Sequence, residues 1–172
     1  MCHECRKRPR VANEPVCLDC RQHNAVMRFK DGHGVSHETA TTWAIASLAP
    51  DSACSACGIL VETLRVLNGR VGWAVRWVLE CTWRLTPDHV NGDPLDNRPE
   101  NIRFLCMCCN TARGKYRSLA DAKRITVRRW NTSGYKWNEI EALNKRTIER
   151  LNDALPTADD GEVSGVQGTA PF

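Results

Sequence analysis

Alternating apolar positions mark the middle of the chain. From residue 71 to residue 85 every odd position is apolar: Val71, Trp73, Val75, Trp77, Leu79, Cys81, Trp83 and Leu85. A period of two places such side chains on one face of an extended chain, so this pattern predicts a strand or hairpin packed on one side. Helical spacing also fits part of the segment. A second, shorter strand is predicted from Ile102 to Leu105.

Helices are predicted on both sides of these strands. Pro50 indicates where the first predicted helix ends. Ser118 followed by Asp121 is typical of a helix start. Acids near the start of residues 137–151 and bases near the end favour a helix there. The predicted helices are Thr39 to Leu48, a segment beginning near Cys109, Ser118 toward Trp130, and Trp137 to Leu151. Together with the strands, they predict an α+β fold.

Composition divides the chain into five parts. Gly32 and Gly34 lie in a stretch typical of a linker, and the residues from Pro156 onward are small, polar and acidic, as in disordered tails. The predicted parts are an N-terminal module (1–23), a linker (24–38), a central domain (39–117), a basic helical segment (118–155) and an acidic tail (156–172).

The amino-acid content is that of a small folded protein. Of the 172 residues, 42% are hydrophobic and 26% are charged, which suffices for one domain with a modest core. No apolar run approaches the roughly 18 residues that a membrane span needs, and the N-terminus has no apolar signal region. We therefore expect a cytoplasmic protein with no membrane association.

Eight of the ten cysteines form pairs with two residues between them. In a reducing compartment such thiols more often bind metal than form disulfides, and two pairs complete a four-thiolate zinc site. Two structural zinc sites are predicted: Cys2, Cys5, Cys17 and Cys20 at the N-terminus, and Cys54, Cys57, Cys106 and Cys109 in the central domain. Cys108 is an alternative to Cys109 as a ligand, and free or redox-active thiols are the alternative to zinc.

The distribution of charge is more informative than the total. Two zinc ions held by four thiolates each would nearly cancel the formal net charge of +4. Residues 111–136, however, carry eight bases against the single acid Asp121, with Tyr116, Trp130 and Tyr135 among them. This cluster is suited to a DNA backbone, although a solvated helix face also explains it. The candidate DNA contacts are Arg113, Lys115, Arg117, Lys123, Arg124, Arg128 and Arg129.

Three stretches of the central domain resemble the HNH endonucleases. They are CSACG at 54–58, DHVNGDPLDNRPENIRFLC at 88–106 and CMCCNTARG at 106–114. The resemblance implies a small zinc-stabilised ββα-metal core that binds one catalytic Mg²⁺ or Mn²⁺ ion and acts on DNA. The final histidine of the family motif is Asn110 here, which resembles a His-Asn-Asn subset that includes phage junction-resolving endonucleases.

The resemblance also implies roles for four residues. His89 corresponds to the general base that takes a proton from water, and a neutral imidazole is suited to that role at physiological pH. Asp88 and Asn110 correspond to the oxygen ligands of the catalytic cation. Asn101 would hold the loop and orient His89 through the backbone, with Asn97 as the alternative for this role.

The adjacency of Asp88 and His89 raises a geometric difficulty. Neighbouring side chains on a regular strand point to opposite faces, so both could not line one site if the strand continued through them. Pro87 lacks an N–H and restricts Thr86, so we expect the strand to end just before the pair.

These observations favour a metal-dependent DNA endonuclease from a bacterium or a phage-infected cell. The sequence is compatible with nicking and with cutting of both strands, and with a monomer, a homodimer or a complex with a phage or host protein. The alternative is a noncatalytic zinc protein that binds nucleic acid or another protein.

Overall fold

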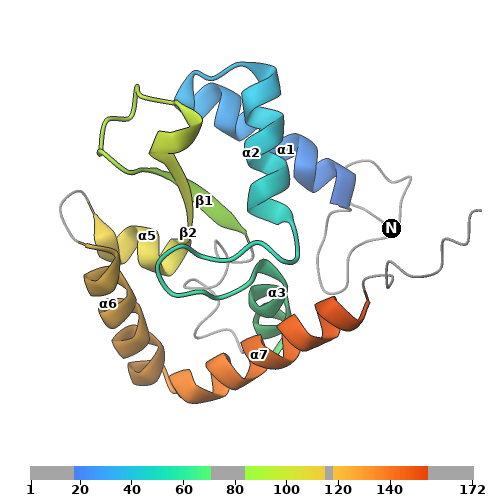
Figure 1. Cartoon of the computed structure of the whole chain (residues 1–172), viewed down its shortest axis with the longest axis vertical. Helices are drawn as coiled ribbons and strands as arrows, with labels where there is room; N and C mark the ends of the chain where they lie inside the picture. Colours follow the sequence, from blue (N-terminus) through green and yellow to red (C-terminus); the bar gives the residue numbers. More distant parts are fainter. Residues whose placement is uncertain (1–17, 71–83, 115–117, 155–172) are drawn as a thin grey trace, which may run out of the picture.

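A computed structural model of the chain describes residues 18–70, 84–114 and 118–154. Within these ranges the fold is α+β, with helices packed around one two-stranded sheet (Figure 1). The elements are α1 (Leu18–His33), α2 (His37–Leu48), α3 (Val61–Arg70), β1 (Leu85–His89), the 3-10 turn η1 (Pro99–Asn101), β2 (Ile102–Cys106), α5 (Met107–Arg113), α6 (Leu119–Thr132) and α7 (Trp137–Asp153). No helix in this described part of the chain is long and apolar enough to cross a membrane.

Strands β1 and β2 form an antiparallel hairpin that continues through Pro87. Pro87 lies opposite Phe104, Asp88 opposite Arg103, and His89 opposite Ile102. The prediction that Pro87 ends the strand is therefore wrong. A two-stranded ladder has an unpaired edge on each strand, and an edge is where a sheet tolerates a residue without an N–H.

Helices α1 and α2 pack against each other on one side of this hairpin. Their apolar side chains share a core to which Phe29 and Trp43 contribute their rings. Most of the segment predicted as a linker is therefore helix, because α1 continues to His33 and α2 begins at His37. Only Gly34 and its neighbours connect the two helices, and the positive φ of +64° at Gly34 suits a residue without a side chain.

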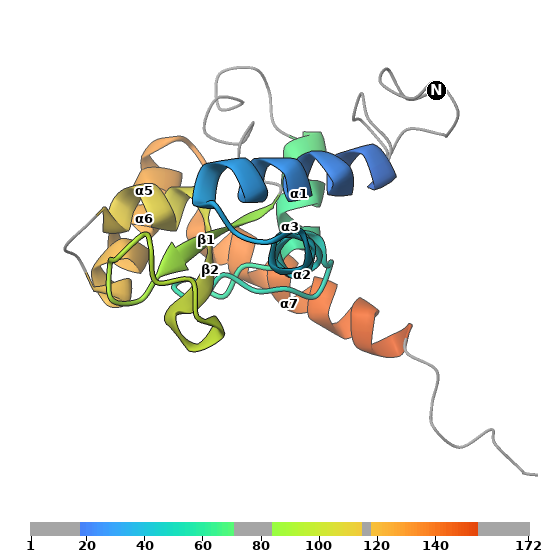
Figure 2. The same cartoon turned by 90° about the horizontal axis from the view of Figure 1, so that it is seen from above.

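The other side of the hairpin carries a second core built from α3, α5, α6 and α7. Leu64 of α3, Leu105 of β2 and Trp130 of α6 are among its buried members. Phe104 packs against both cores, so β2 lies between them. Figure 2 shows the same division, with α1 and α2 on one side of the strands and α5 and α6 on the other.

Several sequence predictions are confirmed. The helix predicted from Thr39 begins slightly earlier, at His37, because the Ser36 side chain caps it by accepting a hydrogen bond from the Thr39 N–H. Ser118 caps α6 in the same way and accepts a bond from the Asp121 N–H. Most of the predicted strand at 71–85 lies outside the described residues, as do most of the N-terminal module and the acidic tail.

Candidate metal centre and active site

Four cysteines meet at the base of the hairpin. Their Sγ atoms all lie within 4.8 Å of one another, and they are Cys54, Cys57, Cys106 and Cys109. The first two flank a turn that Gly58 closes at a φ of +75° by donating its N–H to the Cys54 carbonyl. Cys106 ends β2 and caps α5, where its sulfur accepts a hydrogen bond from the Cys109 N–H. This arrangement fits a tetrahedral four-thiolate zinc site.

Helix α7 fixes the first cysteine turn through one side chain. The Asn144 amide oxygen accepts hydrogen bonds from the Leu60 N–H at 2.9 Å and from the Thr63 hydroxyl at 2.8 Å. Its amide nitrogen donates to the Gly58 carbonyl at 3.0 Å. A helix more than 80 residues away in the sequence thereby holds the turn that carries two of the four thiols.

The alternative ligand Cys108 lies outside this cluster. It is buried, and burial raises the pKa of its thiol to about 12. Within the cluster, hydrogen bonding from Cys106 lowers the pKa of Cys54 and that of Cys109, while the pKa of Cys106 is raised, mainly by hydrogen bonding with Cys109, and that of Cys57 is raised as well. The thiols thus share protons among themselves, and zinc binds them as thiolates.

The second predicted zinc site is mostly outside the described residues. Cys20 lies in the first turns of α1 and is half-buried. Its predicted partners Cys2, Cys5 and Cys17 are not described, so this site stays a prediction.

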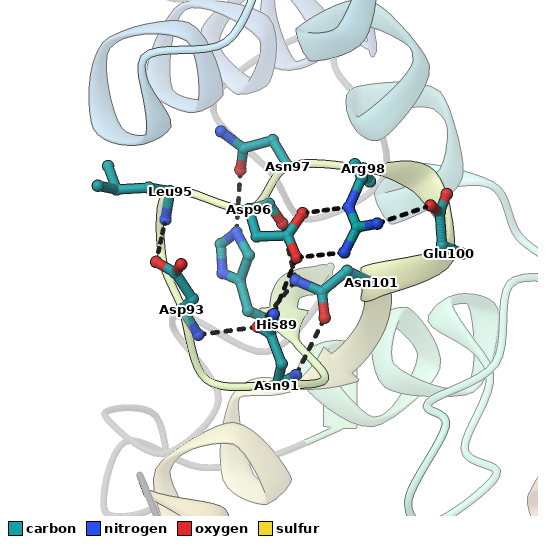
Figure 3. A network of polar contacts seen from close by, with 9 residues as sticks. All are labelled: His89, Asn91, Asp93, Leu95, Asp96, Asn97, Arg98, Glu100 and Asn101. Carbon is teal, nitrogen blue, oxygen red and sulfur yellow. Dashed lines mark hydrogen bonds and ion pairs between the residues drawn. The ribbon is translucent and has the colours of Figure 1, made fainter.

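His89 is held in one orientation at the end of β1 (Figure 3). Its Nε2 lies 2.9 Å from the Asn97 amide oxygen. The Asn97 amide nitrogen donates to the His33 carbonyl at 3.3 Å, which fixes the orientation of the amide. Because an amide oxygen only accepts, this contact favours the tautomer in which Nε2 carries the proton and Nδ1 is the acceptor.

Asn101 organises the loop that carries Asn97. Its amide oxygen accepts from the Asn91 N–H at 3.0 Å, and its nitrogen donates to the Asn91 side chain at 2.9 Å and to the Asp96 carbonyl at 2.7 Å. Arg98 closes the loop by donating twice to Asp96, and this bonding lowers the pKa of Asp96 to about 2. Asn101 thus holds the loop, while the alternative residue Asn97 contacts His89 itself (Figure 3).

Asp88 faces the opposite side of the hairpin from His89. Its Oδ1 lies 2.6 Å from Nη1 of Arg113, and its Oδ2 lies 2.7 Å from Nε of Arg103. Arg113, one of the predicted DNA contacts, is 9% exposed and pairs with Asp88 in this structure, so its contact with DNA stays a prediction. Through this pair Arg113 ties the end of α5 to β1.

Asn110 lies one helical turn before Arg113 on α5. Residues three apart on a helix share a face, so Asn110 lies on the same face of α5 as Arg113, which contacts Asp88. A carboxylate and an amide are hard oxygen donors of the kind that Mg²⁺ and Mn²⁺ prefer, so the donor set fits such an ion. The two guanidinium groups already bound to Asp88 would compete with it.

Helix α6, which packs against α5, carries a basic surface (Figure 1). One face of α6 is buried through Ala122, Thr126 and Trp130. The exposed bases on the helix are Lys123, Arg124, Arg128 and Arg129. Lys115 and Arg117 lie outside the described residues.

Two residues that contact the predicted site were not expected from the sequence. Arg103 pairs with Asp88, and the strand register, once known, indicates it because the two residues are directly opposite. His33 lies with its ring 5.9 Å from that of His89. No pattern in the sequence indicates this contact, because α1 and β1 are far apart along the chain.

Comparisons with known proteins add one finding. The sequence matches no protein-family model and no curated protein. The fold is similar to that of the rare-cutting HNH restriction endonuclease PacI, with a TM-score of 0.43 and 18% sequence identity over 78% of this chain and 98% of that chain. The function is therefore inferred from the residues of this chain.

Proposed function

We propose that this protein is a metal-dependent DNA endonuclease of the HNH type, which hydrolyses phosphodiester bonds by nicking DNA or cutting both strands. The observation that carries the proposal is the contact of His89 Nε2 with the Asn97 amide oxygen at 2.9 Å, which favours the tautomer with Nδ1 as proton acceptor. A histidine held in this way can present Nδ1 as a base, and its neighbour in the sequence, Asp88, has the oxygen atoms that a hard cation prefers.

In the proposed reaction His89 takes a proton from the attacking water at Nδ1. General-base catalysis of this kind contributes about 10²–10⁴-fold to a rate. Asn97 keeps the ring from rotating, and the His33 carbonyl keeps Asn97 from flipping. The Asn101 network holds the loop that carries Asn97, so the base stays in place while DNA binds.

Asp88 and Asn110 are the residues that would hold the catalytic cation. When bound, Mg²⁺ or Mn²⁺ supplies positive charge for the phosphate and for the leaving oxygen. An in-line displacement places the attacking and leaving oxygens on opposite sides of phosphorus. The base and the cation therefore act from opposite sides of one phosphate. Because Asp88 and His89 leave the paired strand on opposite faces, this phosphate would have to lie at the end of β1, where the strand stops at His89.

The exposed bases of α6 are proposed to bind the DNA backbone. One face of α6 is buried, and the exposed bases outside that face are available to phosphates: Lys123, Arg124, Arg128 and Arg129. Arg124 already forms an ion pair with Asp121, with its Nη2 3.0 Å from Oδ1. It should therefore contribute less to DNA binding than the other three bases. Binding through phosphates predicts an affinity that falls steeply as the salt concentration rises.

The competing function is a zinc protein that binds DNA without cutting it. Incubation of zinc-loaded protein with supercoiled plasmid, with and without added Mg²⁺ or Mn²⁺, separates the two. We expect nicked or linear plasmid only when the cation is added. Salt-sensitive binding in a gel shift without any cleavage, across both cations, would favour the noncatalytic alternative.

A further inference from the structure

Asp88 is surrounded by more positive charge than it can neutralise. Its two oxygens pair with two guanidinium groups, those of Arg113 and Arg103, at 2.6 and 2.7 Å. The side chains of Asp88 and Arg113 are only 9% and 10% exposed, so solvent screens this pair little. A divalent cation at Asp88 would therefore meet a positive charge that is already in place.

Arg113 is held less completely than its ion pair suggests. Its Nη2 reaches the carbonyls of His89 and Val90 only at 3.5 and 3.4 Å, near the upper limit for hydrogen bonds. Its Nε is buried and has no hydrogen-bond partner among the described residues. A buried donor without a partner is costly, so the position of Arg113 depends on Asp88.

Arg113 is the last residue of α5, and Gly114 follows at a φ of +52°, so no further turn of this helix encloses the Arg113 side chain on its C-terminal side. A phosphate accepts two parallel hydrogen bonds from a guanidinium, as a carboxylate does, so DNA offers Arg113 an alternative partner. Arg103 differs, because it lies on β2 directly opposite Asp88 and is 20% exposed.

We propose that Arg113 occupies the cation position at Asp88 in the resting protein, and that it moves to a DNA phosphate when the divalent cation binds. This inference rests on the proposed function and adds a means of regulating when the cation binds. Cation and Arg113 compete for the same carboxylate, so cation affinity is low until a phosphate accepts the guanidinium. The protein would then load its catalytic ion mainly on DNA.

The test is a calorimetric titration of zinc-loaded protein with Mn²⁺ in the absence of DNA. Arg113→Met keeps the apolar length of the side chain and removes the competing charge, so we expect it to bind Mn²⁺ at least about tenfold more tightly than the parent. Arg103→Met is the matched control and should raise the affinity less. Asp88→Asn identifies the binding event, because it should abolish it in the parent and in the Arg113→Met background.

Equal affinities of the parent and Arg113→Met, or an equal increase in Arg103→Met, would overturn the inference. These outcomes are distinguishable from failure of the proposed function. In that case the parent protein would cut no plasmid with either cation. If circular dichroism shows that Arg113→Met is unfolded, a crystal structure of His89→Ala with Mn²⁺ and a short duplex replaces it. There we expect Arg113 on a phosphate, and Arg113 still paired with Asp88 beside the bound ion would contradict the proposal.

Discussion

The two faces of the β1–β2 hairpin are supported by different kinds of interaction. Toward α1 and α2 the support is apolar and aromatic, with the ring of Trp43 6.1 Å from that of Phe29 and 5.4 Å from that of His33. Toward α5 the support is a cluster of four thiols and the buried ion pair of Asp88 with Arg113. The proposed base lies on the first face and the proposed cation ligands on the second.

This difference indicates how each half of the proposed site responds to its surroundings. Apolar packing requires no cofactor and responds little to ionic strength. A thiolate cluster and a buried ion pair depend on bound metal and on charge balance. The orientation of His89 should therefore survive changes in metal that disrupt the α5 side, and the predictions below test that separation.

The largest expected effect is loss of the zinc cluster. Structural zinc contributes about 10–16 kcal/mol in small zinc-finger peptides, which equals or exceeds the stability of a typical domain. Cys106→Ser should therefore unfold the α5 side and lose one zinc. Cys108→Ser, which changes a buried thiol outside the cluster, should keep the zinc. Circular dichroism and metal analysis of both variants provide the measurement, and a folded Cys106→Ser protein with full zinc content would contradict the prediction.

Removal of the Trp43 ring comes next, on the other face. Trp43 is 5% exposed, and truncation of a buried Trp to Ala costs about 3–5 kcal/mol. Trp43→Ala should lower the free energy of unfolding by that amount while zinc content stays unchanged. Ile45→Ala is the control, because Ile45 lies on the same helix but is 54% exposed and should change stability by about 0.5 kcal/mol or less. Urea unfolding of both variants would show whether the two faces separate in this way.

A smaller effect is expected from Asn97, which orients the base. Asn97→Ala removes the acceptor for His89 Nε2, and loss of such an orienting partner costs about 10–100-fold in activity. Stability and zinc content should change little. Asn138→Ala, at an exposed position of α7, is the control. Plasmid nicking at the parental rate by Asn97→Ala would mean that another group orients His89.

The smallest effect concerns pH. Burial lowers the pKa of His33 below 6.5, with a further contribution from His89. The unfolded chain therefore binds more protons than the folded protein at pH values between the folded and unfolded pKa. Stability from this group is fully present above about pH 6.5 and is lost as the pH falls through the folded pKa. His33→Phe should flatten this part of the curve of unfolding free energy against pH, and an unchanged slope would exclude His33 as its source.

Local patterns in the sequence predicted the elements around the site. Cysteine spacing indicated which four thiols meet, because a pair with two residues between fits one tetrahedral ion. The capping pair at Ser118 indicated the start of α6, since it depends on residues three apart. Such features are local, and the sequence contains all of their geometry.

Features that depend on distant contacts were not predicted. Two glycines indicated a linker at 24–38, yet burial of Phe29 against Trp43 makes most of that segment helical. Pro87 suggested a strand end, but tertiary packing continues the ladder through it. Arg113 pairs with Asp88, which is 25 residues away in the sequence. The basic cluster around Arg113 does not indicate this contact, so the sequence predicted an exposed side chain.

The central claim is that His89 is the base of a DNA-cutting site. It is tested most directly by the rate at which zinc-loaded His89→Ala nicks supercoiled plasmid in Mn²⁺, compared with the parent and with His37→Ala, an exposed histidine at the start of α2. DNA affinity is measured by gel shift on the same preparations. We predict that His89→Ala loses at least about 100-fold in rate with unchanged affinity, while His37→Ala matches the parent. Cleavage by His89→Ala at the parental rate would contradict the claim.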